Sequence, residues 1–290
     1  MVFLVTVYIV LALYKSKAIK YNGIRGDYMK KILVLVFVGF MSMMFLGCSD
    51  KALTTWDEIE ERGYFIVGLD DTFAPMGFRD ESGELVGFDI DLAKAVSEVL
   101  GVEVQFQPID WDSKVLELNS GKIDMIWNGL TITEEREKEM LFSNPYIENA
   151  QIIMVLENSN IDSISDLEGL TLGVQISSAA EEAVLKNSVS TLLDELVKYD
   201  TYNTALLELN NGQVDAIVID EIMGRYIMSQ NPGEYIVASE NFGEEAYGIG
   251  FRLNSEDIRD KINEALVQLV EDGIAKTISE KWFDEDIFVQ

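Results

Sequence analysis

LELNSGKIDMI (residues 116–126) returns later in the chain as LELNNGQVDAI (residues 207–217). The second copy begins 91 residues after the first, and seven of the eleven positions are identical. Each copy has the pattern of a helix end, a turn built on Asn and Gly, and a short apolar strand. A repeat of this kind predicts two similar α/β lobes, one around each copy.

The segments around the two copies alternate between strand and helix patterns. Strand-like apolar runs occupy residues 63–70, 102–107, 123–127 and 172–175. Helical spacing or charge patterns occupy residues 88–100, 113–118, 133–140, 179–186 and 255–282. This order favours βαβ units and a mainly parallel sheet, so the predicted fold class is α/β.

Composition excludes several classes of function. The 290 residues carry a formal net charge of −29, spread along the chain, which would repel nucleic acid and anionic lipid. Histidine is absent and Cys48 is the single cysteine, so His-based catalysis, Cys-His nucleophiles, ordinary zinc sites and an internal disulfide are all excluded. Carboxylate chemistry remains open, and we expect neither a metal nor a cofactor.

The amino terminus has the layout of a secretory signal. Residues 29–48 read MKKILVLVFVGFMSMMFLGC, with two lysines, an apolar run and then Cys48, followed by Ser49 and Asp50. The sequence before Cys48 resembles a bacterial lipobox, in which the cysteine receives lipid, although Phe45 stands where that pattern usually has Leu. The alternative is a transmembrane helix that ends in an ordinary cysteine. Both place the rest of the chain outside the cytoplasm.

Residues 1–28 precede a signal that is complete without them. Residues 1–14 form another apolar run, followed by lysines. An upstream start codon explains this segment, and the alternative is an additional membrane segment. We therefore assign residues 1–47 to targeting.

The strand ends that follow the repeats are the expected place for a ligand, because open α/β sheets bind ligands outside the carboxyl ends of their strands. The first copy continues into Trp127, Asn128 and Gly129, and the second continues into Val218, Ile219 and Asp220. If the two lobes face each other, these residues line a cleft from opposite sides.

A cleft that buries a zwitterion needs both a cation and a carboxylate. Arg136, near the start of the expected helix 133–140, could bind an anionic group, or it could lie on a solvated helix face. Ser177 and Ser178 precede the expected helix 179–186, where a hydroxyl can cap the helix or donate to a carboxylate. Asp220 is either an ammonium acceptor or an exposed carboxylate at the end of a strand.

Several ordered motifs resemble the polar amino-acid-binding proteins of ABC importers, which are periplasmic-binding-protein-like solute-binding proteins of family 3. The resemblance covers most of residues 56–284 and rests on GLDDTFAPM at 68–76, GFDIDL at 87–92, NGLTITEER at 128–136, FSNPY at 142–146 and VDAIVID at 214–220.

The resemblance implies roles for the residues that bind the backbone of the amino acid. Arg136 would pair with the ligand carboxylate, assisted by Ser178, while Asp220 would take the ammonium. Thr131 and the Gly129 amide would contribute further hydrogen bonds.

The resemblance also implies which residues surround the side chain of the ligand. Phe73 and Trp111 would flank it, although on composition alone both would be core residues. Asp70, Asn128 and Gln175 would contact its polar end. One acid, amide groups and aromatic walls favour a polar or cationic side chain such as that of Gln, Arg or Lys.

By the same resemblance, the fold is the two-lobed type II fold with its ligand cleft between lobes joined by two hinge crossings. Lobe 1 would combine residues 53–147 with 243–290, and lobe 2 would span residues 148–242. The crossings would lie near residues 148–151 and 240–244.

The expected function is that of a monomeric lipoprotein, anchored by lipid at the cell surface or in the periplasm, that passes a free amino acid to an ABC permease and is not an enzyme. One alternative is a dehydratase-like enzyme that uses Asp70 or Glu221 as acid or base. Another is an amino-acid sensor on the same fold.

Overall fold

A computed structural model describes residues 55–289 of the chain. The targeting segment and Cys48 therefore lie outside the described residues. The described residues all lie within one compact unit. Within residues 55–289, no helix has the length and apolar character needed to span a membrane.

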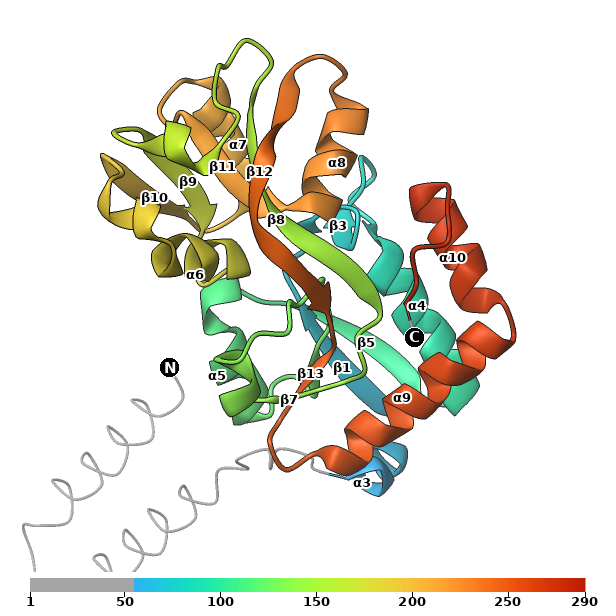
Figure 1. The fold of residues 1–290 in the computed structure, drawn as a ribbon. Coiled ribbons are helices and arrows are strands. Elements are labelled where there is room, and N and C mark those ends of the chain that lie inside the picture. The colour runs from blue at the N-terminus through green and yellow to red at the C-terminus, as the bar shows by residue number, and fades with distance from the viewer. Residues whose placement is uncertain (1–54, 290) are drawn as a thin grey trace, which may run out of the picture. The chain divides into compact units, whose positions relative to one another are not determined.

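The first lobe is built on a five-stranded sheet with the strand order β5-β1-β6-β13-β7 (Figure 1). Its strands are β1 (Tyr64–Leu69), β5 (Glu103–Pro108), β6 (Met125–Ile126), β7 (Leu141–Phe142) and β13 (Gly250–Phe251). The helices are α3 (Trp56–Arg62), α4 (Phe88–Leu100), α5 (Lys114–Ser120), α9 (Glu256–Glu271) and α10 (Ile274–Phe283). A small sheet contains β2 (Thr72–Phe73), β3 (Gly77–Arg79) and β4 (Leu85–Val86).

The second lobe is built on another five-stranded sheet, with the order β10-β9-β11-β8-β12. Its strands are β8 (Ile147–Leu156), β9 (Thr171–Gln175), β10 (Glu195–Tyr199), β11 (Ala216–Asp220) and β12 (Tyr235–Tyr247). The helices are α6 (Ala179–Lys186), α7 (Tyr202–Asn210) and α8 (Glu221–Gln230), with 3-10 turns η3 (Ile164–Leu167) and η4 (Ser188–Thr191).

The expectation of a mainly parallel sheet is wrong, because both sheets are mixed. β1 pairs in parallel with β5 and β6, but β13 pairs antiparallel with β6 and β7. Likewise, β9 pairs in parallel with β10 and β11, whereas β8 pairs antiparallel with β11 and β12. The antiparallel strands are those next to the passages between the sheets, where the chain leaves one sheet and later returns to it.

The chain passes between the two sheets twice. β7 ends at Phe142 and β8 begins at Ile147, while β12 ends at Tyr247 and β13 begins at Gly250. β8 and β12 are long neighbours, and the register of β12 shifts between Val237 and Asn241 and again before Glu244. Figure 1 shows the two strands crossing the middle of the molecule together. The α/β class and the two lobes are as predicted.

The repeat forms the same local structure in both lobes. The first copy contains the end of α5, a turn at Gly121 with φ of 78° and β6, and the second contains the end of α7, a turn at Gly212 with φ of 69° and β11. Positive φ explains why glycine occupies both turns.

The aspartate of each repeat copy pairs with a neighbouring strand in the same way. Asp124 donates its amide to the carbonyl of Ile66 at 2.9 Å, and its Oδ2 accepts the Ile66 amide at 2.8 Å. Asp215 makes the same pair of bonds with Thr171, both at 2.8 Å. The conserved spacing between helix and strand in the repeat therefore aligns an aspartate with the adjacent parallel strand.

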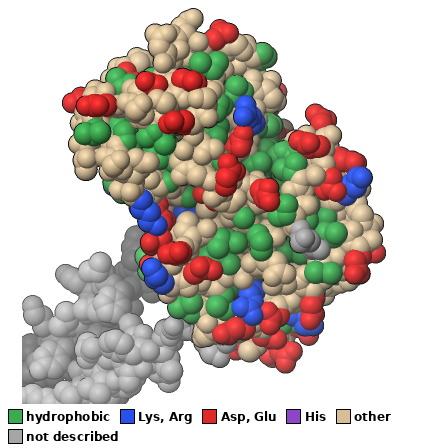
Figure 2. All heavy atoms as spheres, viewed as in Figure 1, with side chains coloured by type: hydrophobic (Ala, Val, Ile, Leu, Met, Phe, Trp, Pro, Cys, Tyr) green, Lys and Arg blue, Asp and Glu red, His purple; other side chains and the backbone are tan. Residues whose placement is uncertain are grey.

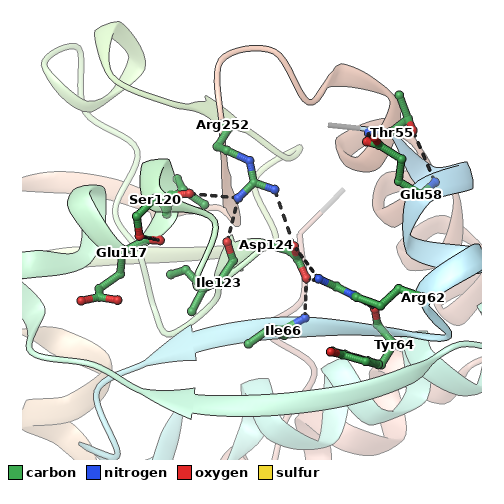
Figure 3. Close-up of polar contacts among 11 residues, drawn as sticks. Thr55, Glu58, Arg62, Tyr64, Ile66, Glu117, Ser120, Ile123, Asp124 and Arg252 are labelled. Atoms are coloured by element: carbon green, nitrogen blue, oxygen red, sulfur yellow. Dashed lines mark hydrogen bonds and ion pairs between the residues drawn. The ribbon is translucent and has the colours of Figure 1, made fainter. Parts of the chain in front are cut away.

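Only the first-lobe aspartate is also an ion-pair centre. Figure 3 shows Asp124 between Arg62 and Arg252, which come from opposite ends of the described chain. Arg252 Nη1 also donates to the carbonyls of Leu118 at 2.9 Å and Ile123 at 2.7 Å. Asp124 and Arg252 are buried, so this cluster joins the returning segment of lobe 1 to its first half.

The surface carries the charge that composition predicts. Figure 2 shows acidic side chains scattered over the visible face, with fewer basic ones among them. The acidic groups form no single block on this face, in agreement with their distribution along the sequence.

Candidate functional site

Buried polar side chains gather where the two lobes meet. Burial of so many polar groups is costly unless they are paired or reserved for a ligand, which marks this interface as the candidate site. They are Asp70, Asp89, Lys114, Asn128, Thr131, Arg136, Asn149, Gln151, Gln175, Ser178 and Asp220.

Arg136 is a buried cation that reaches from the first lobe to the second. Only 7% of the surface of the residue is exposed. Nη1 donates to the carbonyl of Thr131 at 2.8 Å, and Nη2 donates to the carbonyl of Ser177 at 3.3 Å. Burial lowers the pKa of Arg136 from its ordinary value, which its acidic neighbours partly offset.

The predicted helix at residues 133–140 is wrong. The structure has only the 3-10 turn η2 (Arg136–Lys138) in this range, followed by β7 from Leu141, which pairs with β13. The anion-binding helix start that we expected beside Arg136 is therefore not formed. Arg136 itself remains at the interface.

Lys114 is a second buried cation, which the sequence analysis missed. Its Nζ donates to the carbonyl of Trp111 at 3.0 Å and to that of Ser177 at 2.8 Å, and it lies 4.9 Å from the Trp111 ring centre. Burial, together with the positive charge of the nearby Arg136, lowers the pKa of Lys114 to about 7. A lysine at the start of a helix has no sequence signal that distinguishes it from a solvated one.

The second-lobe serines lie at the start of α6. Ser178 is its N-cap and accepts the amide of Glu181 at 3.0 Å. Ser177 adopts a φ of 57°, unusual for a residue with a side chain, and its carbonyl receives both Lys114 and Arg136. The capping role that we considered for Ser178 is therefore present, beside the two cations.

Asp220 ends β11 as a buried carboxylate with several donors. It accepts hydrogen bonds from Asn149 Nδ2 at 2.9 Å, Gln151 Nε2 at 3.0 Å and the Tyr247 hydroxyl at 2.9 Å. Burial raises the pKa of Asp220 to about 7, and the charge of Glu245 adds to the rise. The residue is thus not the exposed strand-end carboxylate of our alternative.

The three residues expected at the side chain of the ligand come together across the interface. Gln175 Nε2 donates to Asp70 Oδ2 at 2.8 Å, joining the two lobes. Asp70 Oδ1 accepts the amide and hydroxyl of Thr72, at 2.9 and 2.6 Å. Asn128 Oδ1 accepts the Asp70 amide at 3.0 Å. Asp70 is therefore oriented from three sides.

The two aromatic residues of the prediction are both buried. The Phe73 ring lies 6.1 Å from that of Tyr202, a residue of the second lobe. Trp111 lies beneath the Lys114 ammonium. Each ring thus belongs to the interface between lobes as well as to the packed interior of the first lobe.

The Gly129 amide is not available in the way that we predicted. It donates to Asp89 Oδ2 at 2.7 Å, and the same oxygen accepts the Tyr146 hydroxyl at 3.0 Å. Burial raises the pKa of Asp89 to about 7. With φ of +57° at Gly129, an added Cβ would lie 2.9 Å from the Phe73 ring. Asp89 therefore holds a loop that accepts only glycine.

Four residues at the Asp220 site were missed by the sequence analysis. They occupy alternate positions on the two long strands, with Asn149 and Gln151 on β8, and Glu245 and Tyr247 on β12. A period of two places both members of a pair on one face of a strand. Polar residues at that spacing in the apolar run of β8 were the signal that could have found them.

The charged groups of the site could bind a small polar molecule. No cluster of three or more metal-ligating side chains occurs in residues 55–289. Arg136 and Lys114 supply positive charge, and Asp220 with Asp70 supplies carboxylate oxygens. This arrangement is suited to a small molecule that carries both signs of charge.

Known proteins are similar to this chain over most of the described residues. A family model described as bacterial extracellular solute-binding proteins, family 3, matches residues 65–285. The L-cystine-binding protein TcyJ of Escherichia coli strain K12 is 31% identical over 258 residues, which cover 88% of this chain and 94% of TcyJ.

Solved structures are also similar. A histidine-bound substrate-binding protein of an ABC uptake transporter from Streptococcus pneumoniae has a TM-score of 0.79 at 37% identity, covering 82% of this chain and 99% of that chain. ArtJ of Geobacillus stearothermophilus, an arginine-, lysine-, histidine-binding protein, has a TM-score of 0.71 at 35% identity, covering 77% of this chain and 96% of that chain.

These similarities confirm the predicted resemblance and the two-lobed type II periplasmic-binding-protein-like fold. The relatives are substrate-binding proteins, in agreement with a role in binding. This chain belongs to the family 3 bacterial extracellular solute-binding proteins, among the amino-acid-binding proteins of ABC transporters.

Proposed function

We propose that this chain captures a free amino acid outside the cytoplasm and delivers it to an ABC importer as a lipid-anchored, monomeric binding protein. The observation that carries the proposal is the pair of buried, oppositely charged residues Arg136 and Asp220 at the junction of the lobes. An amino acid needs both, because each end of the zwitterion loses its hydration when buried. Lipid would attach at Cys48.

Lobe 1 would comprise residues 53–147 with 243–290, and lobe 2 residues 148–242. The ligand would bind first to lobe 1 through Arg136 and Thr131, and lobe 2 would then close with Ser178 and Asp220. Such closure shifts the population towards the state that a permease recognises.

The long contact of Arg136 supports its role at the ligand carboxylate. At 3.3 Å, its bond to the Ser177 carbonyl lies beyond the usual length, while the bond to Thr131 at 2.8 Å is well formed. Thr131 thus orients the guanidinium, and its weakly bound Nη2 can turn to a carboxylate. Lys114 would keep the Ser177 carbonyl satisfied.

The side chain of the ligand would lie between Phe73 and Trp111 and meet Asp70, Asn128 and Gln175. A carboxylate with two amides favours a polar or cationic group, so we propose Gln, Arg or Lys as the ligand class. Relatives named for cystine, arginine and histidine are compatible with a charged or polar ligand.

A thermal-shift screen tests the proposal. Residues 49–290 contain the whole compact unit and would be melted with each of the twenty amino acids, cystine, ornithine and several carboxylic acids that lack an amino group. A rise with one polar or basic amino acid is expected, since a ligand of the native state stabilises it by mass action. Stabilisation by carboxylic acids alone would overturn the role of Asp220.

A further inference from the structure

Glu245 is a half-buried carboxylate on β12 that faces the same donors as Asp220. In the strand register it lies opposite Asn149 of β8. Its Oε1 accepts the Thr131 hydroxyl at 2.7 Å, so it also contacts the segment that orients Arg136. It therefore lies between the carboxylate-binding and ammonium-binding halves of the proposed site.

The two carboxylates share two amide groups. Asn149 Nδ2 lies 2.9 Å from Asp220 Oδ1 and 2.6 Å from Glu245 Oε1. Gln151 Nε2 lies 3.0 and 2.8 Å from the same two oxygens. A primary amide has two N–H groups, so each of these amides can donate to both carboxylates at once.

Four neutral N–H donors leave both negative charges in place. Two carboxylates held by the same amides in a buried site disfavour double ionisation, and burial together with the charge of Glu245 raises the pKa of Asp220 to about 7. Arg136 is the cation that faces the two carboxylates. The other titratable groups around this site are Tyr202, Tyr247 and Glu182.

An acceptor beside the pair is also unused. Gln151 Oε1 is buried and has no hydrogen-bond partner among residues 55–289. It belongs to the carboxamide whose nitrogen Asp220 and Glu245 share. The site thus offers two carboxylate oxygens and one amide oxygen, which matches the three N–H donors of an ammonium group.

We propose that Glu245 is the second carboxylate of the ammonium site, and that the ligand ammonium replaces a proton that Asp220 and Glu245 share. This rests on the proposed amino-acid binding. One proton leaves for the solvent for each ammonium bound, so binding is proton-linked. A ligand without an ammonium leaves the proton in place.

Calorimetric titration at each pH in two buffers with different heats of ionisation measures the proton release directly. The probe is the amino acid with the largest thermal shift. We expect close to one proton released at pH 6 and almost none at pH 8.5, with affinity about tenfold weaker at pH 6 than at pH 8.

Two variants test whether Glu245 is responsible for the proton release. Glu245→Gln keeps an acceptor for Thr131 but removes one charge, so both the proton release at pH 6 and the ratio of affinities between pH 8 and pH 6 should fall well below the wild-type values. Glu244→Gln is the matched control, since it removes the same charge from the neighbouring exposed position of β12 and should leave both quantities unchanged.

Each outcome is decisive. Wild-type binding without proton release overturns this inference and leaves the proposed function intact. Equal release by wild type and Glu245→Gln assigns the proton to another group and overturns the role of Glu245. If no amino acid stabilises the protein, the proposed function fails and this inference fails with it. If Glu245→Gln does not fold, the wild-type buffer series decides.

Discussion

Asp124→Ala should lower the stability of the protein far more than the same substitution at the matching aspartate in the second copy of the repeat. Asp124 is buried between Arg252, which is also buried, and Arg62, which is partly exposed. Removing one partner of a buried ion pair leaves an uncompensated charge and typically costs about 3–5 kcal/mol. The loss of the bond to the Ile66 amide lies within that cost. We expect a loss of about 4 kcal/mol.

Asp215→Ala is the matched control, because Asp215 makes the same backbone contact in the second lobe. Asp215 is exposed and accepts the Thr171 amide at 2.8 Å. A single hydrogen bond of this type contributes about 1 kcal/mol to stability. The two variants thus remove the same side chain from the same motif in different electrostatic surroundings.

Urea unfolding and thermal melting of the unliganded protein, both followed by circular dichroism, measure the two losses. At about 2–4 °C per kcal/mol for a chain of this size, Asp124→Ala should melt roughly 8–16 °C lower than wild type and Asp215→Ala roughly 2–4 °C lower. Equal losses in the two variants would refute the view that the Asp124 ion-pair cluster, rather than the backbone pairing, stabilises lobe 1.

Three further predictions concern the site. Arg136→Met should weaken amino-acid binding more than 30-fold, about 2 kcal/mol, in a calorimetric titration, whereas binding within threefold of wild type would remove Arg136 from the site. Gly129→Ala should lower stability by about 1–3 kcal/mol in urea, because its Cβ would lie 2.9 Å from the Phe73 ring, and an unchanged midpoint would contradict this. The unliganded wild-type protein should lose stability as pH rises from about 4 to 7, because the pKa of Asp220 is raised to about 7 in the folded state. Asp220→Asn should flatten this pH profile by on the order of 2 kcal/mol, and identical profiles would exclude Asp220 as the cause.

The sequence predicted the parts of the fold that follow from local pattern. Helix 88–100, with Gly101 after it, is α4 with its left-handed cap, and helix 179–186 is α6. The repeat predicted two lobes because helix end, turn and strand are all contained in eleven residues. Strand direction was not predictable in this way, since it depends on which distant segments become neighbours in a sheet.

The candidate site was predictable where a residue follows a recognisable strand or motif. Asp220 and Asn128 follow the repeat strands, and both are buried at the interface. Lys114 and Glu245 were not found, because their positions depend on the other lobe and on the register of β12. A charged residue in a helix or a strand looks the same in sequence whether its partner is water or a second lobe.

The predicted Gly129 contact shows a different limit. We expected its amide to contact the ligand, but Asp89, 40 residues earlier in the chain, accepts its hydrogen bond. Competition between an internal acceptor and a ligand cannot be read from spacing. In the structure, Asp89 therefore acts on the site through the conformation of the loop.

The most direct test of amino-acid capture is a titration of one ligand against its two incomplete analogues. The amino acid selected by the thermal-shift screen would be compared with its decarboxylated amine and its deaminated acid. If Arg136 and Asp220 bind the two ends of a zwitterion, each analogue should bind at least 30-fold more weakly than the amino acid, which we expect to bind near micromolar, about −8 kcal/mol. Equal binding of either analogue would contradict the account.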